Sequence, residues 1–523
     1  MAPFPLATPN LRPVAKFFPF SARPVESLAP EVQINHRPPP PPARKRPMPV
    51  SHAYAPDPAC RELGASFYDP VAPADFPARL LRMRNQRWAR RVGLDTLTQA
   101  EWLAHFAGFA PLPDNHPQPL ALRYHGHQFR SYNPDLGDGR GFLFAQMRDD
   151  AGRLLDLGTK GSGQTPWSRQ GDGRLTLKGG VREALATEML EALGVDTSKT
   201  FSLIETGESL WRSDEPSPTR ASVLVRLSHS HLRIGTFQRL LFLSERDNLE
   251  KLLDYAIKTY MPDAWREDRA QRAASFVAEV ARRVARTGAQ WTAAGFVHGV
   301  LNTDNINVTG ESFDYGPWRF LPVLDPRFTA AYFDETGLYA YGRQPEALMW
   351  NLARLAECFT PFTPVDMLQE AIGAFEPAFQ SAFSQAVHAR LGLVESPATQ
   401  DLPAALWRFL EASRAPFERF FFDWFAGAAS AARAAASPSA PFYAREDFAP
   451  VRALLGAGLP REPARLDHAF FAGAPCTLLI EDVEAVWAPI AERDDWSAFE
   501  AKIEAIRTAG AAMGLARLSA EEP

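Results

Sequence analysis

Residues 296–316, which read FVHGVLNTDNINVTGESFDYG, have the residue types and spacing of a phosphate-handling catalytic site. In kinase-like enzymes a His-x-Asp-x-x-x-x-Asn segment precedes an Asp-Phe-Gly-like turn. The first Asp orients the attacking hydroxyl, and the Asn and second Asp hold metal ions on the nucleotide phosphates. Here Asn305 stands seven residues after His298, and Asp314 begins an Asp-Tyr-Gly turn. Because Val300 occupies the position of the usual base, the spacing predicts a metal site whose ordinary base is missing.

A second carboxylate lies next to the predicted metal-binding asparagine. Asp304 directly precedes Asn305 and stands four residues after Val300. Oxygen ligands such as those of Asn305 and Asp314 suit Mg²⁺ or Mn²⁺, which also bind phosphate oxygens of the nucleotide. Asp304 is then the available base, and its displacement indicates that the phosphate under attack lies elsewhere than in a kinase. In the alternative interpretation, Asp304 caps a turn and the protein is a dead kinase that only binds nucleotide.

The tetrapeptide Gly-Asp-Gly-Arg occurs twice upstream of this motif, at residues 137–140 and 171–174. Glycine lets a backbone approach a phosphate closely, and arginine offers a planar fork of donors for phosphate oxygens. A single copy is a common turn, but two copies that flank a Lys-Gly-Ser-Gly turn indicate phosphate-binding loops. Neither copy lies within a GxxxxGK[ST] sequence, so the predicted site is not a P-loop.

Lys160 ends an apolar run, LLDLGTK, that we expect to be a strand. In kinase folds a strand lysine contacts the nucleotide phosphates and pairs with a glutamate of the next helix. The helix predicted over GGVREALATEMLEALG offers two candidates, Glu183 and Glu188. On a helical wheel Glu188 falls within the apolar stripe and Glu183 outside it, so periodicity favours Glu188. Spacing alone leaves the partner of Lys160 open.

Two arginines, Arg226 and Arg233, lie in the segment SVLVRLSHSHLRIG. An arginine near the end of an apolar strand, with another seven residues later, could direct two cations into the cleft. Ordinary salt bridges are the alternative for each. The segment also contains the pair His229 and His231, which would face one way on a strand, as zinc ligands do. No Cys or HExxH-type partner accompanies this pair, so we do not predict zinc.

The elements that must position these residues change in character along the chain. After about residue 68, GFLFAQMRDDAGRLLDLGTKG predicts a β-hairpin and SVLVRLS predicts another strand. Past residue 240, helical patterns dominate. A β-rich part followed by a helical part predicts an α+β, protein-kinase-like two-lobed fold. It has a β-rich N-lobe, a helical C-lobe and a helical C-terminal extension.

The composition of the 523-residue chain is that of an ordinary globular protein, with 46% hydrophobic and 22% charged residues. The formal net charge of −5 gives no basic excess for nucleic acid, and no apolar run of membrane-spanning length occurs. Three scattered cysteines fit a cytoplasmic location. The predicted divisions are a proline-rich disordered tail (1–50), the N-terminal lobe with nucleotide-binding loops (51–225), the helical C-lobe with the catalytic and metal motif (226–410) and the helical C-terminal extension (411–523).

Taken together, these motifs resemble the selenoprotein O / YdiU family of pseudokinase-fold protein adenylyltransferases. The resemblance covers roughly residues 60–360 and rests on YHGHQF, LGDGRG, KGSGQTPWSRQGDGR, VRE, SHSHLRIG, FVHGVLNTDNIN, DYGP and QPEALMWNLARLA. It implies that ATP binds in an inverted orientation. AMP is then transferred to Ser, Thr or Tyr hydroxyls of protein substrates, and pyrophosphate is released. The alternatives are protein uridylylation from UTP, a γ-phosphoryl kinase, and a catalytically dead nucleotide-binding scaffold.

The resemblance also implies a role for individual residues. Asp304 matches the proton acceptor, and Asn305 and Asp314 match ligands of Mg²⁺ or Mn²⁺. Glu183 matches the glutamate that pairs with the lysine, against the preference of the helical wheel for Glu188. The positions that match nucleotide-binding residues are Gly137, Gly139, Arg140, Lys160, Asp172, Gly173, Arg226, Arg233 and Asp314.

The sequence departs from the family pattern in places, and GTKGSGQTPWSRQ and LTLKGGVRE are looser versions of the strings usual in the family. Its last residues, LARLSAEEP, contain no cysteine or selenocysteine, so we do not expect redox control through a disulfide. The string GESLWRSDEPS replaces the GQLWR-like neighbours usual in the family. The changes in these strings could alter the choice of acceptor, but they leave the metal and base positions intact.

Overall fold

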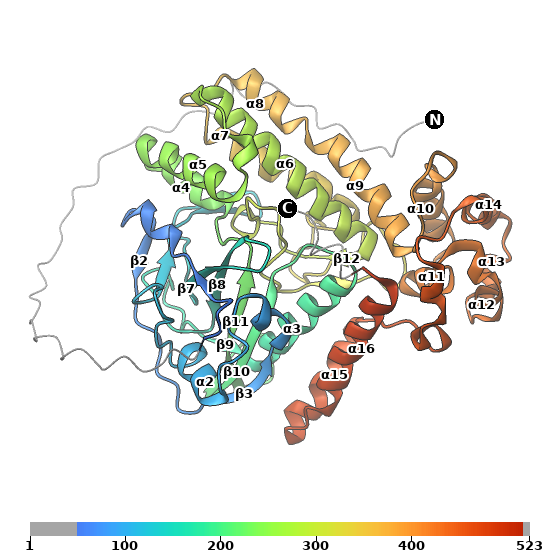
Figure 1. The fold of residues 1–523 in the computed structure, drawn as a ribbon, viewed down its shortest axis with the longest axis horizontal. Coiled ribbons are helices and arrows are strands. Elements are labelled where there is room, and N and C mark those ends of the chain that lie inside the picture. Colours follow the sequence, from blue (N-terminus) through green and yellow to red (C-terminus); the bar gives the residue numbers. More distant parts are fainter. Residues whose placement is uncertain (1–49, 516–523) are drawn as a thin grey trace, which may run out of the picture. The chain divides into compact units, whose positions relative to one another are not determined.

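The computed structural model of the chain describes residues 50–515. The tail expected at residues 1–50 lies outside the described residues except for Val50, as does the C-terminal LARLSAEEP except for Leu515. A β-rich first part is followed by a helical second part (Figure 1), which confirms the α+β prediction. The kinase-like lobes and the boundaries at residues 225 and 410 remain predictions.

An antiparallel sheet dominates the first part. Within residues 50–515 its strands lie in the order β2-β4-β7-β8-β11-β10-β3, while β1 pairs with β7 and β9 pairs with β11. These strands are β1 (Ala55–Pro56), β2 (Tyr68–Pro70), β3 (Leu80–Arg84), β4 (Leu120–Leu122), β7 (Leu143–Arg148), β8 (Leu154–Lys160), β9 (Leu175–Thr176), β10 (Lys199–Leu210) and β11 (Thr219–Ser228). Two small pairs join β5 (Gly126–Gln128) to β6 (Ser131–Asn133) and β12 (Phe296–Val297) to β13 (Arg319–Phe320).

The β-hairpin expected from the sequence is confirmed as β7 and β8. Asp149 stabilises its turn, because the carboxylate accepts hydrogen bonds from the backbone N–H groups of Ala151 and Arg153. All residues of β8 are buried, since the strand lies between β7 and β11 in the sheet. Lys160 is the last residue of β8. Because β8 is a buried, central strand, the backbone of Lys160 has a fixed position.

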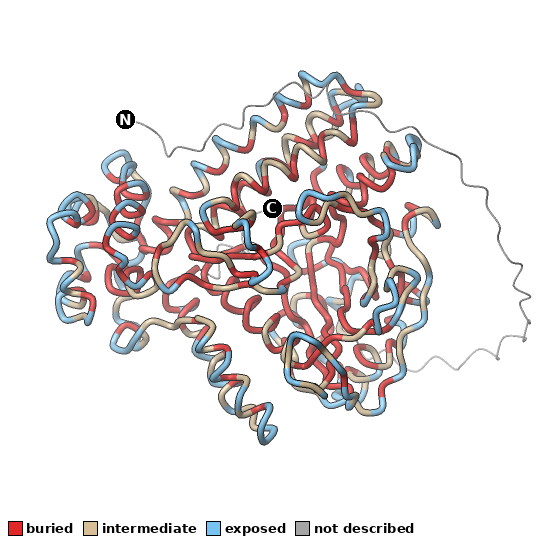
Figure 2. Tube along the Cα trace, turned by 180° about the vertical axis from the view of Figure 1, so that it is seen from behind, coloured by how far each residue is buried: buried red, intermediate tan, exposed pale blue. Residues whose placement is uncertain are grey.

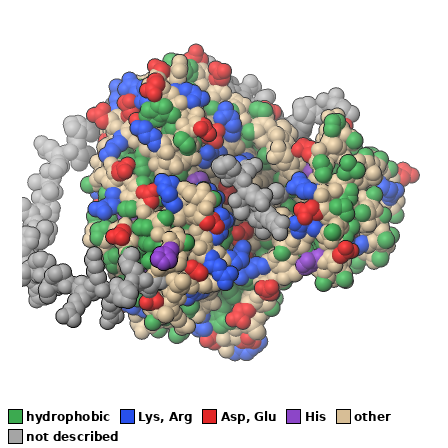
Figure 3. All heavy atoms as spheres, in the orientation of Figure 1, with side chains coloured by type: hydrophobic (Ala, Val, Ile, Leu, Met, Phe, Trp, Pro, Cys, Tyr) green, Lys and Arg blue, Asp and Glu red, His purple; other side chains and the backbone are tan. Residues whose placement is uncertain are grey.

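Helices make up most of the rest of the described chain (Figure 1). They are α1 (Gln86–Arg91), α2 (Gln99–Phe106), α3 (Leu177–Ala192), α4 (Ile234–Phe242), α5 (Arg246–Tyr260), α6 (Arg269–Ala294), α7 (Gln344–Glu357), α8 (Val365–Ile372), α9 (Phe375–Arg390), α10 (Leu402–Ser413), α11 (Phe417–Asp423), α12 (Ala431–Ala436), α13 (Ala440–Tyr443), α14 (Ala449–Ala457), α15 (Ile480–Arg493) and α16 (Ser497–Met513). Between residues 50 and 515, none of the helices has the length and apolar character that crossing a membrane requires. On the face drawn in Figure 3, basic and acidic side chains of the described residues are interspersed.

The helix α3 packs directly on the sheet, against β10 and β11. It begins after Thr176, whose side chain accepts a hydrogen bond from the backbone N–H of Gly179. Gly180 allows the close approach, because a Cβ atom at this position would lie 2.5 Å from Leu203 Cδ1. The helix therefore carries its side chains to a fixed distance from the strands that bear Lys160 and Arg226.

The longest helix between residues 50 and 515, α6, contacts the segment that carries the predicted catalytic motif, since Thr287 and Trp291 donate hydrogen bonds to Gly310 and Ser312. It packs against α7, α8 and α9, and its buried positions alternate mainly with partly buried ones (Figure 2). The helix ends at Gly295, which adopts a left-handed conformation with φ of 64°. A Cβ atom there would lie 2.6 Å from the ring of Phe417, so glycine is required for both reasons. The chain then enters β12 and the segment that begins at His298.

Helices α15 and α16 of the C-terminal part pack on α3. Glu188 of α3 is buried and accepts two hydrogen bonds from Arg507 of α16, at 2.7 and 2.8 Å. Lys178 and Glu484 form a more exposed ion pair across the same contact, at 2.7 Å. The C-terminal helices α15 and α16 therefore stabilise the position of α3, the helix that carries Glu183.

We expect Arg507→Leu to lower the free energy of unfolding by about 2–4 kcal/mol. Glu188 would keep a buried charge with Arg87 as its remaining cationic partner. Glu484→Gln breaks the more exposed pair with Lys178 and is the matched control, with an expected loss below about 1 kcal/mol. Denaturant unfolding measures both values, and equal losses would contradict a special role for the buried pair.

Candidate active site

A cleft of about 630 Å³ collects the residues predicted from the sequence. This volume lies within the range of about 300–1,000 Å³ that is typical of small-molecule sites. The cleft lies between the sheet, the two glycine-containing loops and the motif after β12. Its lining includes Gly137, Gly139, Arg140, Lys160, Asp172, Gly173, Arg226, Arg233, Asp304, Asn305 and Asp314.

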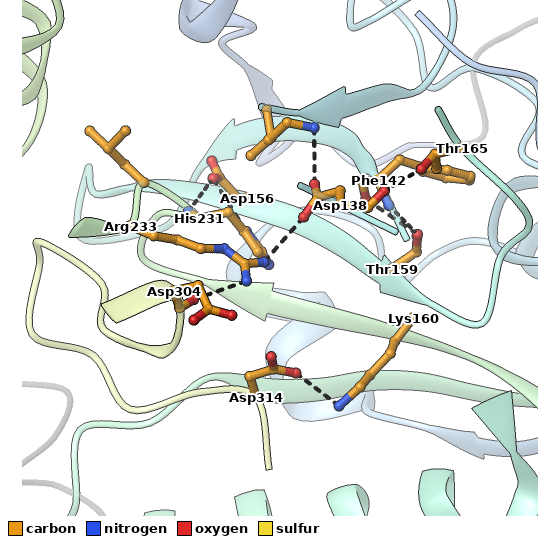
Figure 4. Close-up of polar contacts among 12 residues, drawn as sticks. Asp138, Phe142, Asp156, Thr159, Lys160, Thr165, His231, Arg233, Asp304 and Asp314 are labelled. Atoms are coloured by element: carbon orange, nitrogen blue, oxygen red, sulfur yellow. Dashed lines mark hydrogen bonds and ion pairs between the residues drawn. The ribbon is translucent and has the colours of Figure 1, made fainter. Parts of the chain in front are cut away.

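An ion-pair cluster forms one wall of the cleft. Lys160 Nζ lies 2.6 Å from Glu183 Oε2. It also lies 2.9 Å from Asp314 Oδ1, a contact drawn in Figure 4. Arg226 Nη1 lies 3.2 Å from the same Asp314 oxygen and 3.5 Å from Glu183 Oε1. Burial would raise the pKa of Asp314, but Lys160, Arg226 and Arg233 outweigh burial and hold this pKa well below its usual range. Asp314 is therefore an ionised carboxylate at neutral pH.

The lysine contacts Glu183, as the family resemblance implied, and Glu188 has other partners. Helical periodicity favoured Glu188 because it lies within an apolar stripe. However, α3 is buried on two sides, by the sheet and by α16, so both faces carry apolar residues. Glu188 pairs with Arg507 and Arg87 instead. A helical wheel identifies the buried face from the contrast between apolar and polar residues. A helix that is buried on two faces lacks this contrast.

The two glycine-containing loops, at residues 137–140 and 171–174, are held together by the segment between them. A Cβ atom at Gly137 would lie 2.4 Å from Trp167 Cγ, so the tryptophan ring packs directly on the first loop. Gly173 has a φ of 69°, and a Cβ there would lie 2.2 Å from the carbonyl group of Gly163. The glycines therefore permit the close packing that brings both loops to the same cleft.

Arg233 links the first glycine-containing loop to the candidate base. Its Nη1 donates to the carbonyl oxygen of Asp304 at 3.1 Å, and its Nη2 lies 3.2 Å from Asp138 Oδ1 (Figure 4). The guanidinium also lies over the rings of Tyr124 and Phe313, at 4.4 and 5.0 Å from their centroids. The orientation of Arg233 is fixed by these four contacts.

Asp304 lies in a single 3₁₀ turn, η4 (Thr303–Asn305), and is buried. Its Oδ1 atom has no hydrogen-bond partner among the described residues. Gly126 faces this oxygen, since a Cβ atom at position 126 would lie 3.0 Å from it. Burial raises the pKa of Asp304 to about 6, and the nearby Arg233 opposes this shift. The side chain is thus poised to accept a proton near neutral pH.

The oxygens around Asp304 fit a hard divalent cation. Asn305 Nδ2 donates to the carbonyl oxygen of Val300 at 3.1 Å, so the amide oxygen of Asn305 is left for another partner. Asp314 uses Oδ1 for Lys160 and Arg226, so its second oxygen makes neither contact. Within residues 50–515, no cluster of three or more His, Cys, Asp or Glu side chains could hold an ion by itself. A cation such as Mg²⁺ would therefore need phosphate or water oxygens to complete its coordination.

Several cleft residues had no role in the sequence-based prediction. Arg212 forms a two-pronged contact with Asp172, with distances of 2.8 and 3.0 Å. Arg169 and Trp167 also line the cleft. The sequence signal for Arg212 is weak, because it lies in the polar segment between β10 and β11, 40 residues from Asp172. The three cysteines are free, and the structure places Cys60 and Cys358 in buried positions.

Comparisons with known proteins agree on one family. The family described as "Protein adenylyltransferase SelO" matches residues 51–507 of this chain. A protein of Gloeobacter violaceus named "Protein nucleotidyltransferase YdiU" is 45% identical over 464 residues, which cover 85% of this chain and 93% of that protein. Proteins with the same name from Synechocystis and Trichormus variabilis are 49% and 40% identical. They cover 68% and 87% of this chain, and 74% and 96% of their own lengths.

We expect Asp304→Asn to raise the free energy of unfolding by about 1–3 kcal/mol at about pH 8. The folded-state pKa of about 6 lies above the ordinary value of 3.8, so ionisation of Asp304 disfavours the folded state. This penalty is complete above pH 6 and disappears as the pH falls towards about 4.

Denaturant unfolding with EDTA present, at about pH 8 and pH 4, tests this expectation. The gain should be present at the higher pH and close to zero at the lower pH. A gain that does not change with pH, or a loss of stability at pH 8, would contradict a buried carboxylate without a compensating partner.

Proposed function

This chain belongs to the SelO/YdiU family of protein nucleotidyltransferases, and we propose that it transfers AMP from ATP to Ser, Thr or Tyr hydroxyls of acceptor proteins. The observation that carries this proposal is that Asp304, a buried carboxylate whose Oδ1 has no hydrogen-bond partner among the described residues, lines the same cleft as Asn305 and Asp314. A base at this position, with Val300 in the place of the ordinary kinase base, suits an attack on the α-phosphate of an inverted ATP.

The proposed reaction is a single displacement at the α-phosphorus. Asp304 accepts the proton of the acceptor hydroxyl as the hydroxyl oxygen forms a bond to the α-phosphorus. The bond between the α-phosphorus and the oxygen that bridges to the β-phosphate breaks, and pyrophosphate leaves. The burial that raises the pKa of Asp304 strengthens it as a proton acceptor relative to an exposed aspartate.

The remaining cleft residues serve binding and charge neutralisation. We assign Asn305 and Asp314 to the divalent cation, Mg²⁺ or Mn²⁺, which would neutralise phosphate charge when bound. Lys160, held by Glu183, and the arginines of the cleft face the phosphates as fixed cations. Both glycine-containing loops line the cleft, and their glycines would allow a phosphate to approach the backbone closely. Rate enhancement in phosphate transfer depends mainly on such positioning and on charge.

We further propose that the cleft is kinase-like and lies between a β-rich lobe and a helical lobe. In support, Lys160 ends a central strand, and its partner Glu183 belongs to the helix that follows the second glycine-containing loop. The motif with Asn305 and Asp314 follows the long helix α6. This arrangement has the order of parts of a protein kinase, with the base moved by four residues.

The nucleotide and the transferred group are tested by labelling. Protein, acceptor lysate and Mg²⁺ or Mn²⁺ receive ATP labelled at the α- or the γ-phosphate, or α-labelled UTP. We expect protein label from α-labelled ATP and none from γ-labelled ATP. Label from the γ-position alone would show a kinase, and stronger label from UTP would show uridylylation. Nucleotide binding without any label would favour the scaffold.

The roles of the two acidic residues are separated by substitution. We expect Asp314→Ala to abolish metal-dependent ATP binding and transfer. We expect Asp304→Asn to keep ATP binding within a few-fold while transfer slows by about 10²–10⁴-fold, the usual contribution of a general base. Equilibrium binding and α-label transfer measure the two effects, with the exposed Asp447→Asn as control. Loss of binding in Asp304→Asn would make this residue a ligand and not a base.

A further inference from the structure

His231, the second histidine of the Ser-His-Ser-His segment, lies behind the cleft wall and is 4% exposed. Its backbone N–H donates to Asp156 Oδ2 at 2.8 Å, and its ring Nδ1 lies 3.4 Å from the same oxygen (Figure 4). On the other side of the ring, Nε2 lies 3.1 Å from Arg226 Nε. His231 therefore bridges a buried carboxylate and an arginine of the ion-pair cluster.

The partners of His231 determine where its proton lies. An arginine side chain has donors only, so Nε2 of His231 must accept the hydrogen bond from Arg226 Nε. The proton of the neutral ring is then on Nδ1, which faces Asp156. Asp156 is itself held by Gln146, whose Nε2 donates to Asp156 Oδ1 at 2.7 Å. This chain of contacts fixes one tautomer, because the reverse tautomer would place two donors against each other.

A glycine in the adjacent strand makes room for this ring. Gly158 of β8 is the register partner of Arg226 in β11. A Cβ atom at Gly158 would lie 2.2 Å from His231 Nε2, and the three nearest atoms to it all belong to the His231 ring. The ring thus lies directly against the backbone of β8, with Nε2 within hydrogen-bond distance of Arg226 Nε.

The contact leaves Arg226 with one defined orientation. Its Nε is bound to His231, and its Nη1 is bound to Asp314 and Glu183. Nη2 takes part in none of these contacts, and Arg226 lines the cleft. We propose that His231, oriented by Asp156, is a positioning residue that holds the Arg226 guanidinium so that it can serve the nucleotide phosphates. This inference rests on the proposed function in so far as it assigns a phosphate to Arg226.

The removal of His231 has a specific consequence. Arg226 Nε would become a buried donor without an acceptor, and the guanidinium would be expected to rotate towards another partner. Both its contact with Asp314 and its presentation to the cleft depend on the present orientation. If His231 contributes to nucleotide binding through Arg226, as proposed, its contribution should vanish when Arg226 is absent.

A double-mutant cycle on ATP binding tests the inference. With Mg²⁺ present, we expect His231→Leu to weaken ATP binding about tenfold, the order of a misplaced charge-assisted contact. In the Arg226→Ala background, His231→Leu should cause no further loss. His229→Leu is the matched control, because His229 is a half-buried histidine of the same segment whose ring contacts Tyr260 and not Arg226. Thermal melting verifies that each variant folds.

Equal losses from His231→Leu in the wild-type and Arg226→Ala backgrounds would overturn the inference, as would equal effects of His229→Leu and His231→Leu. A second measurement does not depend on a variant that folds. Ring ¹⁵N shifts of the intact protein should show His231 protonated at Nδ1 and unprotonated at Nε2, and the reverse tautomer would overturn the assignment. Because the cycle reads ATP binding and not transfer, label from γ-labelled ATP would contradict the proposed function without deciding this test.

Discussion

The ion-pair cluster of Lys160, Glu183, Arg226 and Asp314 is the constraint on which the arrangement of the site depends. Charges taken out of water are stable only when they are paired and hydrogen-bonded, so none of the four can move without leaving another uncompensated. Each comes from a different part of the chain: β8, α3, β11 and the turn after β12. The cluster therefore fixes the sheet, the helix on its face and the catalytic motif relative to one another.

Asp304 has the opposite environment to Asp314, although the two share a cleft. Cations hold Asp314 ionised, whereas burial without a partner for Oδ1 raises the pKa of Asp304. Two carboxylates whose environments separate their pKa values are suited to different tasks. One keeps a fixed charge, as a cation ligand must, and the other can gain and lose a proton. A buried carboxylate without full compensation lowers the free energy of unfolding. Such a local loss of stability is expected at functional sites and not in a core.

Local patterns in the sequence predicted the local structure well. The hairpin of β7 and β8 and the helix α3, expected over residues 179–194 and observed at Leu177–Ala192, each depend on residues close in sequence. Contacts between distant segments could not be read in the same way. Helical periodicity favoured Glu188 as the partner of Lys160. The pattern of α3 alone gives no sign that α16, which lies far along the chain, covers the second face of α3. The same holds for the ion pair of Arg212 with Asp172 and for the contact of His231 with Arg226. Both depend on how the strands pair, which the spacing of residues in the sequence does not show.

Arg233 links Asp304, the proposed base, to the first Gly-Asp-Gly-Arg loop. Arg233 donates to the carbonyl oxygen of Asp304 and also pairs with Asp138 of the first Gly-Asp-Gly-Arg loop. A shift of either the loop or the base would break one of these buried contacts, so their separation is set by the reach of a single guanidinium. Asp304 is therefore held at a fixed distance from the loop that is expected to bind the nucleotide. The position of Val300, where a kinase has its base, has no such link through Arg233. A triphosphate that enters in the inverted direction would meet loop and base as one unit, which explains why both differ from the kinase pattern together.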